Sequence, residues 1–221
     1  MRTTIGTLLI CCGLAVANLA IAGEVTGRLS LPEAPEPVRK ATADLYGKYQ
    51  AEPVTSIAPA VGVVALLSPK GPIPLEPGKT PVVDQKGLAF RPQVLAVQTG
   101  QAVDFLNSDP VFHNIFSLSP VKRFDLGRYA KGRSKAVTFD RAGIVQYFCD
   151  IHPEMNGVIV VVETPYFTVT DPGGAYRITD VPPGTYEVAV WTSSGSNKMQ
   201  VLGKVTVPET GSVPFTADLD R

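Results

Sequence analysis

The residues best suited to chemistry lie in one short stretch, residues 147–155, which reads YFCDIHPEM. It holds a thiol at Cys149, an imidazole at His152 and a thioether at Met155, each three residues from the next. These side-chain types are sparse, because the whole chain has three cysteines, three methionines and two histidines. The other histidine is His113. Imidazole, thiolate and thioether together form the donor set of a mononuclear copper site for electron transfer.

Three rival interpretations use these residues differently. A cysteine–histidine nucleophilic pair needs a third residue to orient the base, and an oxyanion hole, and the sequence offers no evident candidate for the third residue. A structural zinc site prefers more thiolates and would leave Met155 unused. Cys149 could also be a buried structural residue. The copper interpretation uses all four side chains, and it predicts a metal-binding protein rather than an enzyme.

The N-terminus is typical of an exported protein. Arg2 precedes an apolar run over residues 5–19, and the small residues that follow resemble a cleavage site. We therefore expect residues 1–22 to be a signal peptide and the mature protein to be exported to the periplasm, with no membrane span after cleavage. An uncleaved anchor is the alternative. Cleavage would leave Cys149 as the one cysteine, a free thiol that a bound metal would protect.

The composition indicates an all-β protein without a nucleic-acid partner. Charged residues make up 18% of the chain and balance to zero, and the 20 glycines and 20 prolines indicate many turns. In residues 144–148, two-residue alternation places Val145 and Tyr147 on one face, so that Cys149 leaves the strand pointing inward. The expected strands are 24–31, 61–67, 93–97, 102–106, 136–139, 144–148, 157–162, 176–178, 185–191 and 203–207.

A proline-rich segment, residues 68–81, fits neither a helix nor a central strand and indicates a boundary. Beyond the middle of the chain, Thr170–Ile178 and Asp180–Val190 resemble the transthyretin-like, or carboxypeptidase regulatory-like, β-sandwich. Such domains usually open with a strand like Val25–Leu29, which here lies near the N-terminus.

This resemblance implies a discontinuous second domain. We expect residues 23–79 and 163–221 to form one small sandwich, with residues 80–162 inserted in it or adjacent to it. The alternative is that residues 23–79 form an irregular arm that wraps the middle domain.

Residues 80–162 resemble the cupredoxins, the type 1 blue copper proteins, whose fold is a Greek-key β-sandwich. The Cys-x2-His-x2-Met spacing is similar to the ligand loop of the amicyanins and shorter than that of the plastocyanins. Upstream, Val103–Asn107 leads as a strand to His113, which also fits the family.

The resemblance implies one type 1 copper ion per chain. Its ligands would be three equatorial residues and one weak axial residue: His113, Cys149, His152 and Met155. Asn114 matches the family residue whose backbone N–H donates to the cysteine sulfur. Phe148, on the opposite face of the cysteine strand, is a second candidate beside the site.

The function implied by the resemblance is one-electron transfer by a non-enzymatic carrier. The ring edge of His152 would be the electron port, and a redox protein such as a dehydrogenase or a c-type cytochrome would dock there. Two alternatives come from other classes. One is copper delivery or storage, and the other is an envelope structural or interaction module with a vestigial copper fold.

Overall fold

The computed structural model describes residues 22–31, 60–75, 78–193 and 197–218. These ranges contain strands and no helix, so the predicted all-β fold is confirmed. Accordingly, they contain no helix long and apolar enough to cross a membrane. The signal peptide predicted for residues 1–22 lies outside them, apart from Ala22.

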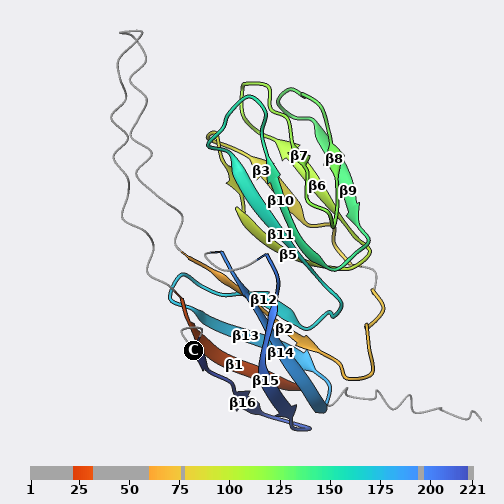
Figure 1. Ribbon diagram of the computed structural model, residues 1–221, viewed down its shortest axis with the longest axis vertical. Helices are drawn as coiled ribbons and strands as arrows, with labels where there is room; N and C mark the ends of the chain where they lie inside the picture. Colours follow the sequence, from red (N-terminus) through yellow and green to blue (C-terminus); the bar gives the residue numbers. More distant parts are fainter. Residues whose placement is uncertain (1–21, 32–59, 76–77, 194–196, 219–221) are drawn as a thin grey trace, which may run out of the picture.

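The central sandwich comprises nine strands: β3 (Val82–Gln85), β4 (Phe90–Arg91), β5 (Val94–Gln98), β6 (Gln101–Asn107), β7 (Phe116–Ser117), β8 (Phe124–Asp125), β9 (Ser134–Phe139), β10 (Gly143–Phe148) and β11 (Asn156–Val162). They form two sheets, with the orders β5-β11-β10-β7-β8 and β4-β3-β6-β9 (Figure 1). The core between the sheets contains Phe105, Phe139 and Tyr147, together with Cys149 and Met155. The candidate sulfur ligands therefore belong to this core.

The flanking sandwich comprises the remaining strands: β1 (Gly23–Ser30), β2 (Gly62–Leu67), β12 (Phe167–Val169), β13 (Ala175–Val181), β14 (Gly184–Thr192), β15 (Gln200–Val207), β16 (Ser212–Pro214) and β17 (Ala217–Asp218). One sheet has the order β13-β1-β16, with β17 also paired to β1, and the other has the order β12-β2-β14-β15. Strands from before and after the central sandwich therefore share both sheets. The transthyretin-like character of this sandwich stays a prediction.

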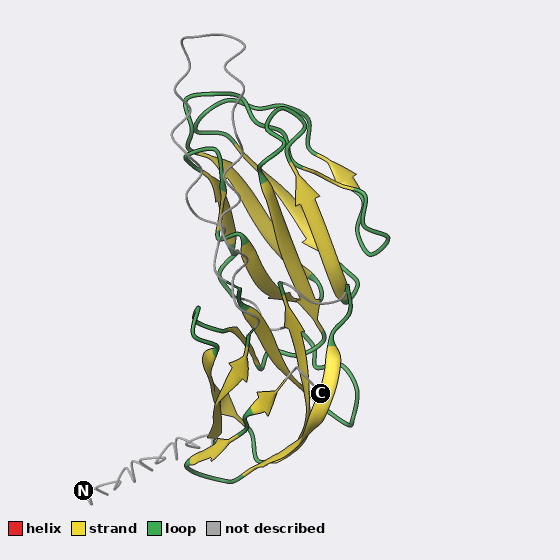
Figure 2. Cartoon of the chain, turned by 60° about the vertical axis from the view of Figure 1, so that its left-hand side comes forward, coloured by secondary structure: helices red, strands yellow, loops and turns green. Residues whose placement is uncertain are grey.

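The two sandwiches are stacked along the long axis of the molecule (Figure 2). The junction between them is a third apolar core, which we call the interface cluster. Its buried members are Val63, Ala65 and Trp191 from the flanking sandwich and Ala96, Ile144, Val160 and Val162 from the central one. Because β2 and residues 158–162 of β11 are thus covered on both faces, these stretches are continuously apolar instead of alternating.

Each of the ten predicted strands overlaps an observed one. The strands that were not predicted are β3, β4, β7, β8, β12, β16 and β17, which are only two to four residues long. Such short segments carry too few residues for an alternating pattern to emerge.

Candidate metal centre

Cys149 directly follows β10, and the alternation of that strand determines where its side chain points. Val145 and Tyr147 are fully buried, whereas Gln146 and Phe148 are exposed. Cys149 continues the buried series with 5% of its surface exposed, so its predicted inward orientation is confirmed.

The loop after Cys149 is closed by two backbone hydrogen bonds. The N–H of Cys149 donates to the carbonyl of Met155 at 3.1 Å, which continues the pairing of β10 with β11. The N–H of Met155 donates to the carbonyl of His152 at 2.9 Å. The three-residue spacing therefore forms a tight turn in which all three side chains start close to one end of β10.

His113 approaches from a different part of the chain. It lies beyond β6, and its backbone exchanges hydrogen bonds with Tyr129 in an isolated antiparallel bridge. The side chain of His113 is fully buried. Residues 36 positions apart in sequence thus reach the same end of the central sandwich.

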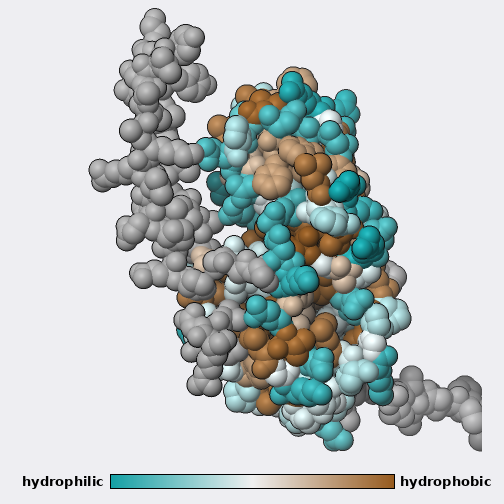
Figure 3. Space-filling model, in the orientation of Figure 1, coloured by the Kyte–Doolittle hydropathy of each residue, from teal (hydrophilic) through white to brown (hydrophobic). Residues whose placement is uncertain are grey.

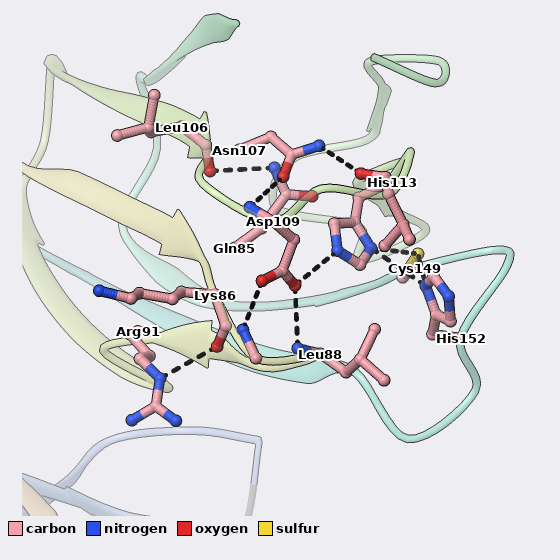
Figure 4. A network of polar contacts seen from close by, with 12 residues as sticks. Gln85, Lys86, Leu88, Arg91, Leu106, Asn107, Asp109, His113, Cys149 and His152 are labelled. Atoms are coloured by element: carbon pink, nitrogen blue, oxygen red, sulfur yellow. Dashed lines mark hydrogen bonds and ion pairs between the residues drawn. The ribbon is translucent and has the colours of Figure 1, made fainter. Parts of the chain in front are cut away.

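The structure brings His113, Cys149 and His152 together (Figure 4). The Cys149 Sγ atom lies 3.9 Å from Nδ1 of His113 and 3.7 Å from Nδ1 of His152. The two Nδ1 atoms are 3.0 Å apart. Both rings therefore present the same nitrogen, Nδ1, to the sulfur.

The two sulfur–nitrogen separations fit one small metal ion. Metal–nitrogen bonds of about 2.0 Å and metal–sulfur bonds of about 2.3 Å place the two donors about 3.7 Å apart when the ligands spread evenly in a plane. Both sulfur–nitrogen separations agree with that value. A soft thiolate with two imidazoles is also a donor set that suits copper in both oxidation states.

Met155 is the fourth residue of the predicted set, and its role as a ligand stays a prediction. It is 1% exposed and belongs to the same core cluster as Cys149. Its backbone is hydrogen-bonded to both Cys149 and His152, which keeps the residue next to these two donors in the chain. A thioether at such a position suits the weak axial ligand of a blue-copper site.

Asp109 is a residue of the site that sequence reasoning missed. Its Oδ2 atom lies 2.9 Å from Nε2 of His113, on the side of the ring away from the sulfur (Figure 4). A carboxylate at this place orients the imidazole and makes its other nitrogen a better donor. The signal in the sequence was a carboxylate four residues before the upstream histidine.

These surroundings lower the pKa of two groups at the site, Asp109 and His152. Burial tends to raise the pKa of Asp109, but hydrogen bonds from the backbone of Leu88 and Gly87 and from His113 outweigh it, so the pKa lies below its ordinary value. Burial, followed by repulsion from His113, lowers the pKa of His152. Both shifts favour an anionic carboxylate and a neutral ring, and a neutral ring is the form that binds a metal.

Asn114 and Phe148 lie beside the centre in different ways. Asn114 is buried, and its side-chain amide donates to Asp125 Oδ1 at 3.2 Å. Its backbone hydrogen bond to the cysteine sulfur stays a prediction. Phe148 points to the opposite face of β10, where its ring centroid lies 6.0 Å from that of Phe116. Phe148 is next to the centre because it directly precedes Cys149 in the sequence, while its ring packs near Phe116.

Comparisons with known proteins agree with the chemistry of these residues. Residues 79–162 match the family described as copper binding proteins, plastocyanin/azurin family. Over 88 residues the chain is 27% identical to amicyanin from Paracoccus versutus, and the alignment covers 38% of this chain and 67% of that protein. The resemblance of the central sandwich to this copper-binding family is thus supported, and the group of His113, Cys149 and His152 is compatible with copper.

Two solved structures illustrate the same similarity. One is an oxidised proline-to-alanine mutant of amicyanin, with 28% identity and a TM-score of 0.36, covering 38% of this chain and 82% of that one. The other is a copper-containing nitrite reductase from Thermus scotoductus SA-01, with 28% identity and a TM-score of 0.38, covering 42% of this chain and 26% of that one.

Proposed function

We propose that this protein is a periplasmic one-electron carrier that holds a single type 1 copper ion. The observation that carries the proposal is the convergence of His113, Cys149 and His152, with spacing suited to one ion, in a region that matches a copper-binding family. Copper bound there would supply a one-electron couple between Cu(I) and Cu(II).

The protein side chains support carriage of an electron rather than catalysis. Four ligands, with Met155 as the weak axial one, would leave no open position for a substrate, whereas catalytic metal sites keep one open. His113 and Cys149 are buried, which excludes water from the donors. We therefore propose a non-enzymatic role.

His152 is the best candidate for the electron port, because it is partly exposed while His113 is fully buried. Exposed apolar side chains occur on the loops at this end of the sandwich: Leu88, Val111, Phe112 and Ile151. Figure 3 shows apolar surface, in brown, at this tip of the molecule among hydrophilic side chains. Such a surface favours a transient protein partner, for which we propose a dehydrogenase or a c-type cytochrome.

Copper titration tests the proposal directly. Adding Cu(II) to the metal-free protein should give an intense thiolate-to-copper absorption band in the visible range and an EPR signal of one copper per chain. Cys149→Ala should lose the band. Met155→Leu is the matched control within the same loop, and it should keep the band while the reduction potential changes, because only the weak axial donor is removed.

The alternatives give different results in the same protein. Voltammetry of a carrier should show a reversible one-electron wave, and the copper should be released slowly to a competing chelator. Fast release without a reversible wave would indicate copper delivery or storage. Absence of any thiolate-to-copper band in the folded protein would overturn the copper site itself and leave an envelope structural or interaction module.

A further inference from the structure

The turn between β3 and β4, Lys86–Ala89, has an unusual backbone. The N–H of Lys86 donates to the carbonyl of Ala89 at 3.0 Å, and between them Gly87 and Leu88 both have positive φ, 67° and 55°. Glycine adopts this conformation freely, but in a leucine the Cβ atom comes too close to the following carbonyl oxygen, so the conformation is strained. The side chain of Leu88 is 53% exposed, so its own burial does not offset that strain. Strain of this kind usually secures something else in the structure.

The strained turn directs two backbone N–H groups at one carboxylate. The N–H of Gly87 donates to Oδ1 of Asp109 at 2.6 Å, and the N–H of Leu88 donates to Oδ2 at 2.9 Å. The backbone N–H of Asp109 in turn donates to Oδ1 of Asn107 at 2.9 Å. Asp109 is 6% exposed, so these contacts replace most of its water. Consecutive amides that converge in this way make a small anion-binding concavity.

The same carboxylate determines which nitrogen of His113 carries the proton. Oδ2 of Asp109 accepts from Leu88 and also lies 2.9 Å from Nε2 of His113. An ionised carboxylate can only accept hydrogen bonds, so Nε2 must be the donor. The lone pair is then on Nδ1, the atom that faces Cys149 and His152.

We propose that the turn Lys86–Ala89 is a positioning element of the metal centre, in which the backbone N–H of Leu88 holds Asp109 and thereby fixes the tautomer and ring orientation of His113. This inference deepens the copper site proposed above and rests on it for its purpose. Figure 4 shows the chain of contacts from the turn through Asp109 to His113. The strain at Leu88 is maintained because the hydrogen bond to Asp109 needs a residue that has positive φ and a backbone N–H.

The test is nitrogen NMR of the two histidine rings in the metal-free protein, which reports the tautomer whether or not copper binds. Four variants of Leu88 separate backbone conformation from side-chain packing. Leu88→Gly and Leu88→Asn tolerate positive φ and keep the N–H, and they are the matched controls. Leu88→Val disfavours positive φ, and Leu88→Pro lacks the N–H.

We expect the wild type and both controls to show His113 as the Nε2–H tautomer with a slowly exchanging ring proton. In Leu88→Val and Leu88→Pro the exchange rate of that proton should rise about tenfold or more, because a hydrogen bond to a charged group is lost. In copper-loaded samples the reduction potential should change in the same two variants and not in the controls.

Equal exchange rates and tautomers in all four folded variants would overturn the proposal. If Leu88→Val and Leu88→Pro do not fold, Asp109→Ala decides the question, because it removes the acceptor for His113 Nε2–H. An unchanged His113 tautomer and exchange rate in that variant would show that the carboxylate fixes nothing. A metal-free protein that shows the predicted pattern but binds no copper would support the positioning contact and refute the function. The two failures are therefore distinguishable.

Discussion

Replacing Trp191 by alanine tests whether the two sandwiches unfold as one unit. Trp191 is the single tryptophan of the chain, lies on β14 with 5% of its surface exposed, and belongs to the interface cluster. On the other side of that cluster, Ile144 and Val160 come from strands of the central sandwich. A cavity left at Trp191 therefore weakens the contact between the sandwiches as well as the flanking sandwich.

The size of the effect follows from the burial of Trp191. An indole that buries about 200 Å² at about 25 cal/mol per Å² contributes at most about 5 kcal/mol, since the unfolded chain already covers part of this surface. Large aromatic-to-alanine replacements in cores cost about 3–5 kcal/mol. We expect Trp191→Ala to lower the free energy of unfolding by about 3–5 kcal/mol.

Urea unfolding of the metal-free protein, followed by two probes, provides the assay. Far-UV circular dichroism reports all the strands, whereas the ring protons of His113 and His152 report the central sandwich alone. Both probes should give one shared midpoint, which Trp191→Ala moves to lower urea. Val201→Ala, at a residue 54% exposed on β15, is the control and should change stability by less than about 0.5 kcal/mol. A histidine midpoint that stays at the wild-type value in Trp191→Ala would refute the shared unfolding.

Two further predictions concern the core next to Cys149. Gly157→Ala should destabilise the protein by about 1–3 kcal/mol, because the added Cβ would lie 2.3 Å from the ring of Tyr147, and urea unfolding measures the loss. Tyr147→Phe should leave stability unchanged or raise it by about 1 kcal/mol, because the buried hydroxyl of Tyr147 has no hydrogen-bond partner among the described residues. A clear loss of stability in Tyr147→Phe would indicate a partner for that hydroxyl.

The sequence predicted the parts of the fold that repeat a local pattern. The alternation in β10 correctly placed Cys149 in the core, and the apolar runs correctly located β2 and β11. The spacing of Cys149, His152 and Met155 also identified the short loop that carries the candidate donors. Each of these features depends on residues that are close in sequence, where strand periodicity and turn length determine the geometry.

The features that the sequence did not predict depend on contacts between distant residues. Nothing local marks Leu88 for positive φ, because leucine is an unusual residue there and its reason lies in a hydrogen bond to Asp109, 21 positions away. The interface cluster was missed for a similar reason. A continuously apolar stretch such as residues 158–162 of β11 indicates burial on both faces but does not say which element covers the second face.

The asymmetry of the candidate ligands bears on the choice between a carrier and a delivery protein. His113 is fully buried, bonded through its backbone to Tyr129 and through its ring to Asp109, so its donor atom is fixed without a metal. Cys149 is likewise held by a backbone hydrogen bond to Met155. Only His152 is partly exposed.

A site with two fixed, buried donors and one accessible ring suits rapid electron exchange. Fixed donors keep one geometry in both oxidation states, so little rearrangement accompanies the transfer. A delivery protein needs accessible donors that can leave, since a receiving ligand must reach the copper as the donors are released one by one. At this centre His113 and Cys149 are buried, so among these three donors only His152 is accessible to a competing ligand. This order of accessibility favours the transfer of electrons over the transfer of the ion.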